Sequence, residues 1–309
     1  MKKINNIFVI GLGAIGASYA AKLYDMDPEC VTVIADKKRI ERYSREPLSV
    51  NGRTYNFKYV EPHEKASVPD LILVAVKYHN LQQTIEDIRD HVGKDTIVMS
   101  LLNGIDSEDM IAEKLGIGSM IYSTCVAIDA VRRGNSINYS TFGRIEFGEK
   151  LNTTHSQRVE SLKELFARAD IPYVIPEDML KALWWKYMLN IGVNQVSAVL
   201  KAPYNAFQRV QEVKGLMADA MREVAAVSKK LGIELNEEDI AKADRTIDLL
   251  SPEGKTSMLQ DVEAGRKTEV RMFAGVLCEL GKKYGVETPV NNMLLKIIEA
   301  IEGINMLKS

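Results

Sequence analysis

Residues 4–16 decide the fold, and they read Ile4-Asn5-Asn6-Ile7-Phe8-Val9-Ile10-Gly11-Leu12-Gly13-Ala14-Ile15-Gly16. The part up to Ile10 is typical of a short buried strand, and the part from Gly16 to about Tyr24 has the pattern of a helix. A second strand is predicted over Val31–Ala35, and it is followed by Asp36, twenty residues after the last glycine. A strand, a G-x-G-x-x-G turn, a helix and a distant acid together indicate a dinucleotide-binding βαβ unit.

Each glycine of this loop has its own role in the motif. Gly11 makes the tight turn, Gly13 lets the backbone approach a pyrophosphate, and Gly16 lets the helix lie close to the strand. The N–H groups at the helix start would face the phosphates. We therefore predict that the cofactor-binding residues of the loop are Gly11, Leu12, Gly13, Ala14, Ile15 and Gly16. A glycine-rich turn without a ligand is the structural alternative.

Asp36 bears on which dinucleotide binds. A carboxylate at the end of the second strand accepts hydrogen bonds from the ribose hydroxyls of NAD(H), and it repels the 2′-phosphate of NADP(H). Lys37, Lys38 and Arg39 follow directly. These three residues either supply the counter-charge for that phosphate or form a solvated helix start, and the sequence leaves both readings open.

Two further buried strands are predicted over Asp70–Val76 and Thr96–Leu102. Lys77 follows the first, and Asn103-Gly104 follows the second. Because ligands of parallel sheets bind beyond the carboxyl ends of the strands, we expect Lys77 and Asn103 to face the same crevice as the glycine loop. A surface lysine and a turn asparagine are the alternatives. The remaining predicted strands are Leu48–Val50 and Arg53–Phe57, which form a hairpin about Asn51-Gly52, then Ile121–Ala127, Ser136–Tyr139, Arg144–Phe147 and Tyr173–Ile175.

From Glu177 onward helical patterns replace the strand signals. The helices that we predict cover residues 178–200, 204–231, 237–250, 257–284 and 290–307. The sequence therefore predicts an α/β Rossmann domain with a parallel sheet over residues 1–176 and an all-α domain over residues 177–309.

The first of these helices contains a polar stripe. Lys186, Asn190 and Asn194 are spaced by four residues, so their side chains lie along one side of the helix over roughly 12 Å. The helix is otherwise apolar and contains both tryptophans. An ammonium and two amides suit a small, oxygen-rich ligand. A solvated helix face is the alternative.

The helix predicted over 257–284 begins with a second candidate group. Ser257 and Gln260 match an S-x-x-Q capping box, so Ser257 is expected either to cap the helix or to help bind an anion at its start. Glu269, predicted on the same helix, would lie about 18 Å further along it. Taken alone, Glu269 is a surface carboxylate.

Composition excludes several classes of function. The chain has 309 residues, a formal net charge of −2 and 46% hydrophobic residues, so we expect neither a nucleic-acid nor a membrane partner. The predicted strand follows Met1-Lys2-Lys3 directly, which leaves no room for a signal peptide. The three cysteines and four histidines have no metal-ligand spacing, so we expect no metal site and surface histidines. A soluble cytoplasmic protein is predicted.

Taken together, the glycine loop, Lys77, Asn103-Gly104, the polar stripe and the segment 257–269 resemble those of the ketopantoate reductase (2-dehydropantoate 2-reductase) family. The resemblance covers nearly the whole chain in the same order. It implies a Rossmann domain and a helical domain similar to that of 6-phosphogluconate dehydrogenases. It also implies the reduction of 2-dehydropantoate to (R)-pantoate with NADPH, on the way to pantothenate and coenzyme A.

Residue roles follow from the same resemblance. Lys186 looks like the general acid and a substrate contact, and Glu269 looks like the carboxylate near the nicotinamide ribose. Lys77 and Asn103 look like cofactor contacts. The residues that look like substrate ligands are Asn103, Asn190, Asn194 and Ser257.

The sequence departs from the family pattern at two places. Gln195 stands where a proline often follows the second asparagine. Tyr204 stands where some members have a further substrate-binding asparagine, and Asn205 comes one residue late. The exact 2-keto acid is therefore open, as is the preference between NADP(H), which the family uses, and NAD(H), which Asp36 favours.

Two other functions remain as alternatives. The first is another NAD(P)-dependent hydroxyacid or polyol-phosphate dehydrogenase of the same fold. The second is a non-catalytic nucleotide sensor, which would be expected to lack Lys186. The expected partner is a small 2-keto acid, and a homodimer is left open.

Overall fold

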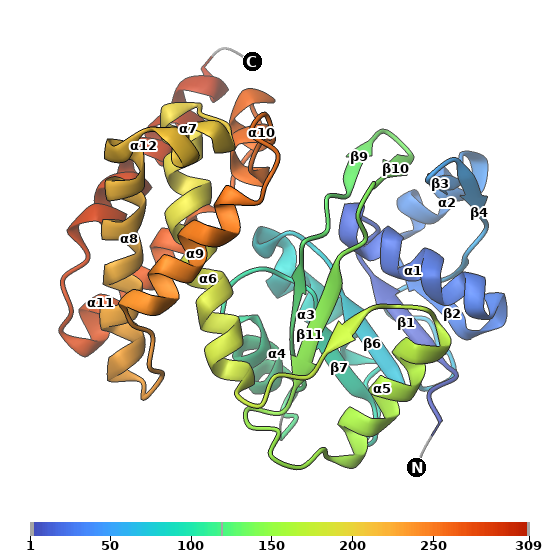
Figure 1. Cartoon of the computed structure of the whole chain (residues 1–309). Helices are drawn as coiled ribbons and strands as arrows, with labels where there is room; N and C mark the ends of the chain where they lie inside the picture. The colour runs from blue at the N-terminus through green and yellow to red at the C-terminus, as the bar shows by residue number, and fades with distance from the viewer. Residues whose placement is uncertain (1–2, 119, 308–309) are drawn as a thin grey trace. The chain divides into compact units, whose positions relative to one another are not determined.

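The computed structural model describes residues 3–118 and 120–307. The chain divides into two compact units, the first ending at Leu180 and the second beginning at Lys181 (Figure 1). The sequence predicts this boundary after residue 176. The difference is small because α6 (Met179–Leu200) begins within the last residues of the first unit.

A parallel sheet of five strands organises the first unit. The strands follow the order β5-β2-β1-β6-β7, which is the order of a Rossmann sheet. Their bounds are Ile7–Ile10 for β1, Val31–Ile34 for β2, Lys58–Val60 for β5, Leu71–Val74 for β6 and Ile97–Ser100 for β7. β5 is not among the strands predicted from the sequence, because this edge strand has only three residues and only Val60 is buried.

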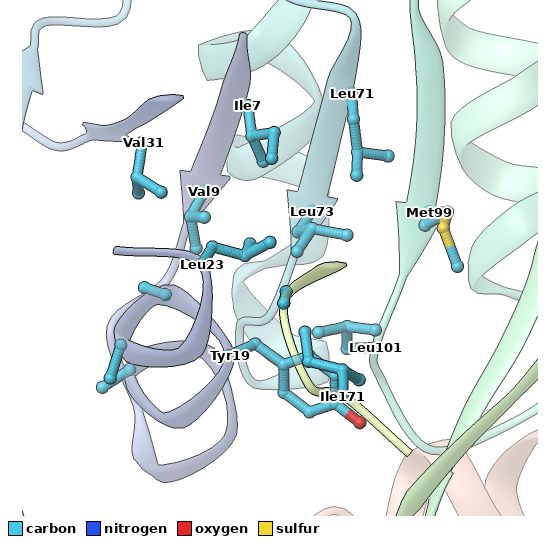
Figure 2. Close-up of a cluster of buried hydrophobic side chains, with 14 of the residues drawn as sticks. Ile7, Val9, Tyr19, Leu23, Val31, Leu71, Leu73, Met99, Leu101 and Ile171 are labelled. Atoms are coloured by element: carbon cyan, nitrogen blue, oxygen red, sulfur yellow. The ribbon is translucent and has the colours of Figure 1, made fainter. Parts of the chain in front are cut away.

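Successive side chains of the central strands enter different cores. Ile7 and Val9 belong to one hydrophobic cluster with Tyr19 of α1 (Ala14–Met26), as Figure 2 shows. Phe8 and Ile10 belong to the other cluster. This alternation is the side-chain period of a strand, and both faces of the sheet are covered. It confirms the prediction of buried parallel strands.

Four more helices complete the two layers. The cluster that contains α1 also includes residues of α5 (Gln157–Arg168), and the opposite cluster includes residues of α3 (Leu81–Arg89) and α4 (Ser107–Leu115). The fifth helix, α2 (Lys37–Arg45), is mostly exposed and buries Tyr43.

Two small sheets flank the parallel sheet. One has the order β4-β3-β10-β9, and the other has the order β12-β11-β8. The first contains the predicted hairpin, in which Asn51 and Gly52 both have positive φ, as a type I′ turn requires. The strands of the first small sheet are β3 (Leu48–Val50), β4 (Arg53–Tyr55), β9 (Val131–Arg133) and β10 (Ser136–Asn138). Those of the second are β8 (Tyr122–Val126), β11 (Arg144–Gly148) and β12 (Tyr173–Val174).

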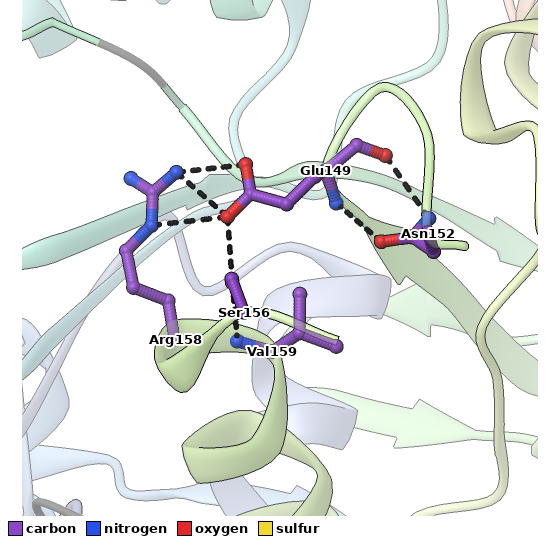
Figure 3. A network of polar contacts seen from close by, with 5 residues as sticks. All are labelled: Glu149, Asn152, Ser156, Arg158 and Val159. Atoms are coloured by element: carbon purple, nitrogen blue, oxygen red, sulfur yellow. Dashed lines mark hydrogen bonds and ion pairs between the residues drawn. The ribbon is translucent and has the colours of Figure 1, made fainter. Parts of the chain in front are cut away.

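A polar network fixes the connection from β11 to α5 (Figure 3). The Glu149 carboxylate accepts hydrogen bonds from Arg158 at 2.8 Å and from the Ser156 hydroxyl at 2.7 Å. Ser156 also caps α5 by accepting a hydrogen bond from the Val159 N–H. The loop is closed by Asn152, which accepts a hydrogen bond from the Glu149 N–H at 2.9 Å.

The second unit is helical throughout its described length. Its helices are α6 (Met179–Leu200), α7 (Tyr204–Arg209), α8 (Gln211–Lys230), α9 (Glu237–Asp248), α10 (Ser257–Glu263), a π-helix (Arg271–Gly275), α11 (Val276–Tyr284) and α12 (Pro289–Met306). Over residues 3–118 and 120–307, no helix has both the length and the apolar character that crossing a bilayer requires.

Two helices that were predicted to be continuous are each divided in the structure. The helix predicted over 204–231 is broken at Val210, whose backbone is extended. The helix predicted over 257–284 ends at Glu263. Gly265 has a positive φ, which ends the helix and turns the chain in another direction. The segment that follows contains the π-helix, and such short π segments are frequent at functional sites.

Candidate active site

Three predicted site residues occupy equivalent places at one edge of the parallel sheet. Ile10 of β1 pairs with Val74 of β6, and Val74 pairs with Ser100 of β7. Gly13, Lys77 and Asn103 each come three residues after these aligned positions. The structure therefore places the glycine loop, Lys77 and Asn103 beyond the carboxyl ends of neighbouring strands, where Rossmann domains bind their ligands.

A part-buried hydrogen bond joins the segments that follow two of these strands. The hydroxyl of Tyr78, next to Lys77, donates to the carboxylate of Asp106, three residues after Asn103. Asn103 is half-buried and Lys77 is exposed. The loops that follow β6 and β7 are thus fixed to each other within the first unit.

The glycine loop has the steric properties that a bound dinucleotide requires. A Cβ on Gly11 would lie 2.4 Å from the Ala75 carbonyl oxygen, and a Cβ on Gly16 would lie 1.9 Å from the Gly11 carbonyl oxygen. A side chain is therefore excluded at both positions. At Gly13 the nearest such atom is 4.0 Å away, so the loop itself leaves room there for a ligand.

The start of α1 is electrostatically suited to phosphate. Gly13 is its N-cap and offers no side chain to the free N–H groups, and the first turn contains no acidic residue. A pyrophosphate would therefore find unshared N–H donors and the positive end of the helix dipole. These features fit a dinucleotide at Gly11 to Gly16.

Asp36 has a structural role that was not predicted from the sequence. It is the N-cap of α2, and its carboxylate accepts a hydrogen bond from the Arg39 N–H at 2.8 Å. The Arg39 side chain lies 3.4 Å from the other carboxylate oxygen. Lys37 and Lys38 are exposed, and among the described residues no carboxylate pairs with them. Asp36 is therefore partly neutralised by Arg39.

In the second unit, α6 carries the predicted polar stripe. Lys186 and Asn190 are half-buried, and Asn194 is 8% exposed. Over the described part of the chain, the side-chain amides of Asn190 and Asn194 have no hydrogen-bond partner. A nearly buried amide without a partner is costly unless a ligand or water satisfies it.

Gln195, the departure from the family pattern, has a clear role in packing. Its side chain donates hydrogen bonds to the Ile191 carbonyl at 2.9 Å and to the Asn291 side-chain oxygen at 3.0 Å. Asn291 belongs to α12 and is held by Glu223 of α8. Gln195 thus fixes the part of α6 that carries Asn194.

The expected cap of α10 is wrong by one residue. Thr256, not Ser257, is the N-cap, and its hydroxyl accepts a hydrogen bond from the Leu259 N–H at 3.1 Å. The same hydroxyl donates to Ser197 of α6 at 3.1 Å. Ser257 is exposed at the first helical position, and within the described ranges its hydroxyl has no partner. The Thr256–Ser197 bond places Ser257 near the stripe-bearing part of α6.

The predicted position of Glu269 on the helix of Ser257 is also wrong, because that helix ends six residues earlier. Glu269 precedes the π-helix, and its carbonyl accepts hydrogen bonds from the Met272 and Phe273 N–H groups. Its neighbour Thr268 is anchored to Glu302 of α12 at 2.6 Å. The Tyr187 hydroxyl, next to Lys186, donates to the Phe273 carbonyl at 2.7 Å. Glu269 is thereby held in a fixed segment joined to α6.

The contacts or burial of three residues in the first unit were not predicted from the sequence. Arg132 of β9 donates a hydrogen bond to the carbonyl of Leu12 in the glycine loop, 120 residues away in the sequence. Glu108 is 2% exposed, and burial raises the pKa of its carboxyl to about 7. The histidines were expected on the surface, but His91 is buried with its ring against Phe8. No local pattern signals the contacts of Arg132 and His91, because each joins residues far apart in the sequence.

Comparisons with known proteins point to one family. The family model described as ketopantoate reductase PanE/ApbA matches residues 7–152, and its C-terminal counterpart matches residues 178–302. A 2-dehydropantoate 2-reductase of Aquifex aeolicus is 26% identical over 308 residues, which cover 98% of this chain and 99% of the relative.

Solved structures of this kind are also similar. A 2-dehydropantoate 2-reductase from Methylococcus capsulatus is 27% identical, with a TM-score of 0.83 and coverage of 97% of both chains. A D-mandelate dehydrogenase in complex with NADH and anilino(oxo)acetate is 23% identical, with a TM-score of 0.87 and coverage of 97% of this chain and 99% of the other. The likeness to the D-mandelate dehydrogenase is a likeness of fold only.

The class is thus an oxidoreductase with an N-terminal Rossmann domain and a helical C-terminal domain. Within this class, the chain belongs to the ketopantoate reductase family, whose name connects it with pantothenate biosynthesis.

Proposed function

We propose that this protein reduces 2-dehydropantoate to (R)-pantoate with NAD(P)H, as a 2-dehydropantoate 2-reductase. The proposal rests on two amides of α6, Asn190 and Asn194, on the same helix as Lys186. Neither amide has a hydrogen-bond partner among the described residues. A keto acid with hydroxyl and carboxylate groups would satisfy these amides. The family membership and the 26% identity to a 2-dehydropantoate 2-reductase support the same reaction.

The first unit supplies the dinucleotide site in this proposal. Gly11, Gly13 and Gly16 shape the loop, and the N–H groups of Ala14 and Ile15 bind the pyrophosphate. Lys77 and Asn103 contact the cofactor from the neighbouring strand ends. When bound, the reduced nicotinamide supplies a hydride to the ketone carbon.

The second unit supplies the residues that act on the keto acid. Negative charge develops on the ketone oxygen, and the Lys186 ammonium stabilises this charge and donates the proton. Asn190 and Asn194 hydrogen-bond the substrate and orient it, together with Asn103 and the Ser257 hydroxyl. Glu269 binds the ribose next to the nicotinamide.

A second candidate is the reduction of an aromatic 2-keto acid to a D-2-hydroxy acid. The fold likeness to a D-mandelate dehydrogenase is high. Tyr204 stands where a substrate-binding asparagine would serve a hydroxyl group, and Asn205 is engaged by Glu253 at 3.2 Å. The aromatic ring of Tyr204, in place of an asparagine amide, favours a less polar substrate.

A substrate panel decides between the two candidates. We would measure kcat/KM for 2-dehydropantoate, phenylglyoxylate and short aliphatic 2-keto acids with NADH and with NADPH. The first proposal predicts that 2-dehydropantoate is the best substrate by at least about tenfold. A higher kcat/KM for phenylglyoxylate would replace the first candidate by the second, and turnover of none would refute both.

A further inference from the structure

Arg132 makes an unusual long-range contact with the glycine loop. It lies in β9, and its Nη1 donates a hydrogen bond to the Leu12 carbonyl, 120 residues away in the sequence. Its Nε donates to the Gly134 carbonyl at 2.8 Å, and its Nη2 is 3.5 Å from the Asn135 side-chain oxygen. The guanidinium is therefore held at three points.

The surrounding hairpin keeps this arginine in place. Asn135 donates hydrogen bonds to the Glu46 carbonyl at 3.0 Å and to the Glu46 carboxylate at 3.3 Å. β10 pairs with β3 in parallel, and α1 packs against both strands. The guanidinium thus has a fixed place beside the loop, and little entropy would be lost when it binds a ligand.

The donors of Arg132 are only partly used. A guanidinium carries five N–H groups, and the three contacts take one on each nitrogen. One N–H remains on each terminal nitrogen. Two neighbouring N–H groups in one plane form the fork that binds two oxygens of a phosphate.

The positive charge of Arg132 also lacks a counter-charge. Across residues 3–118 and 120–307, no carboxylate lies within ion-pair distance of the guanidinium, which is half-buried. Its partner Leu12 is next to Gly13, the N-cap of α1, so the cation lies near the positive end of a helix. A cation at this end of a helix is unfavourable unless an anion joins it.

We propose that Arg132 binds a phosphate of the dinucleotide and supplies its counter-charge. The inference rests on the proposed function only in taking a dinucleotide as the ligand of the glycine loop. The phosphate is either the pyrophosphate, which NADH and NADPH share, or the 2′-phosphate, which only NADPH has. The comparison of the two nucleotides distinguishes these sources.

The test measures nucleotide binding in the absence of keto acid. We would compare the Kd of NADH and of NADPH for the wild type, Arg132→Gln, Arg132→Lys and the control Arg133→Gln. Arg133 is the next residue of β9, is exposed, and points to the opposite face of the strand. Thermal unfolding without nucleotide establishes that each variant is folded.

Arg132→Gln is expected to raise the Kd of at least one nucleotide by about tenfold or more, while Arg133→Gln stays within about twofold of the wild type. Arg132→Lys keeps the charge but loses the fork, so its Kd should lie between the two. An equal effect on both nucleotides assigns the pyrophosphate, and an effect on NADPH alone assigns the 2′-phosphate.

Ionic strength separates charge from a merely structural role. If Arg132 contacts a phosphate, the difference in Kd between the wild type and Arg132→Gln should shrink as salt is raised to about 0.5 M. A difference that does not change with salt would show that Arg132 only supports the Leu12 backbone. Unchanged binding of both nucleotides by Arg132→Gln would also overturn the inference. Nucleotide binding without any reduction of 2-dehydropantoate would instead refute the proposed function alone.

Discussion

The hydroxyl of Tyr187 donates a hydrogen bond to the backbone carbonyl of Phe273 at 2.7 Å, and this bond joins α6 to the π-helix. Tyr187 follows Lys186 directly, and the π-helix begins two residues after Glu269. Both tyrosine and phenylalanine are buried, with ring centroids 6.2 Å apart. One buried contact thus fixes the spacing between the segments that carry a proposed general acid and a proposed ribose ligand.

Tyr187→Phe removes this hydrogen bond and keeps the ring. We expect the free energy of unfolding to fall by about 1 kcal/mol, and kcat/KM to fall by up to about fivefold as Lys186 and Glu269 lose their fixed spacing. Urea denaturation and steady-state kinetics measure the two effects. Tyr284→Phe is the control, because no hydrogen bond of its hydroxyl is found among the described residues. Unchanged stability and kinetics would show that the bond contributes nothing.

Lys186→Ala should lower kcat by several orders of magnitude, because its interaction with the ketone oxygen is made mainly in the transition state. Nucleotide Kd should stay close to that of the wild type. Lys229→Ala, an exposed lysine at the end of α8, serves as the control. A Lys186→Ala variant with near-normal kcat would exclude Lys186 as the general acid.

Asn194→Ala should raise KM for the keto acid by roughly tenfold, the equivalent of one buried hydrogen bond to a charged group, and leave nucleotide Kd unchanged. The reason is that its amide has no partner in the described protein, so truncation removes a contact to the substrate rather than one within the fold. Asn292→Ala, on the exposed side of α12, is the matched control. An equal loss of nucleotide affinity would place the stripe against the cofactor instead.

Much of this site follows from local sequence patterns. The glycine loop, Lys77 and Asn103 could be predicted because strand ends and glycine turns are encoded by adjacent residues. The spacing of the α6 stripe follows from helix geometry alone. Their roles remain proposals, since position does not establish chemistry.

The errors have a different origin. Thr256 and Ser257 are both residue types that can cap α10. Thr256 is the cap, and its hydroxyl also donates a hydrogen bond to Ser197, 59 residues away. The helix break at Val210 has no glycine or proline to signal it, whereas Gly265 does signal the end of α10. Tertiary contacts override such local preferences.

We expect Glu108 to make the stability of the first unit depend on pH. Its carboxylate accepts hydrogen bonds from the Ser107 hydroxyl at 2.8 Å and from the Ser123 N–H at 3.4 Å, but burial raises its pKa from an ordinary 4.5 to about 7. An acid whose folded pKa is raised stabilises the fold most at low pH. This contribution is lost as pH rises from the unfolded pKa to the folded one.

The free energy of unfolding is expected to fall by on the order of 3 kcal/mol as pH rises from 4.5 through about 7, and to level off above. Glu108→Gln mimics the protonated side chain. Its free energy of unfolding relative to the wild type should therefore increase over this range. Glu113→Gln, at an exposed position of the same helix, should show no such trend. A constant difference between Glu108→Gln and the wild type would contradict the prediction.

The choice between NADH and NADPH depends on Asp36, where the family and the residue disagree. The carboxylate repels a 2′-phosphate, and its hydrogen bonds with ribose hydroxyls would contribute about 1.5–3 kcal/mol each. Lys37 and Lys38 are exposed, and exposed ion pairs contribute only about 0–1 kcal/mol each. We therefore expect the protein to accept NADH. Arg39 reduces the repulsion because its guanidinium lies 3.4 Å from one oxygen of Asp36, while its backbone N–H donates to the other.

Asp36→Ser tests this balance without removing the cap of α2, since serine is also a good N-cap residue. We expect the ratio of kcat/KM for NADPH to that for NADH to rise by about tenfold or more, which corresponds to about 1.4 kcal/mol. Asp27→Ser, which changes another capping aspartate, should leave the ratio unchanged. If the wild type already prefers NADPH by tenfold, Asp36 does not contact the ribose, and the neighbouring basic side chains bind the phosphate.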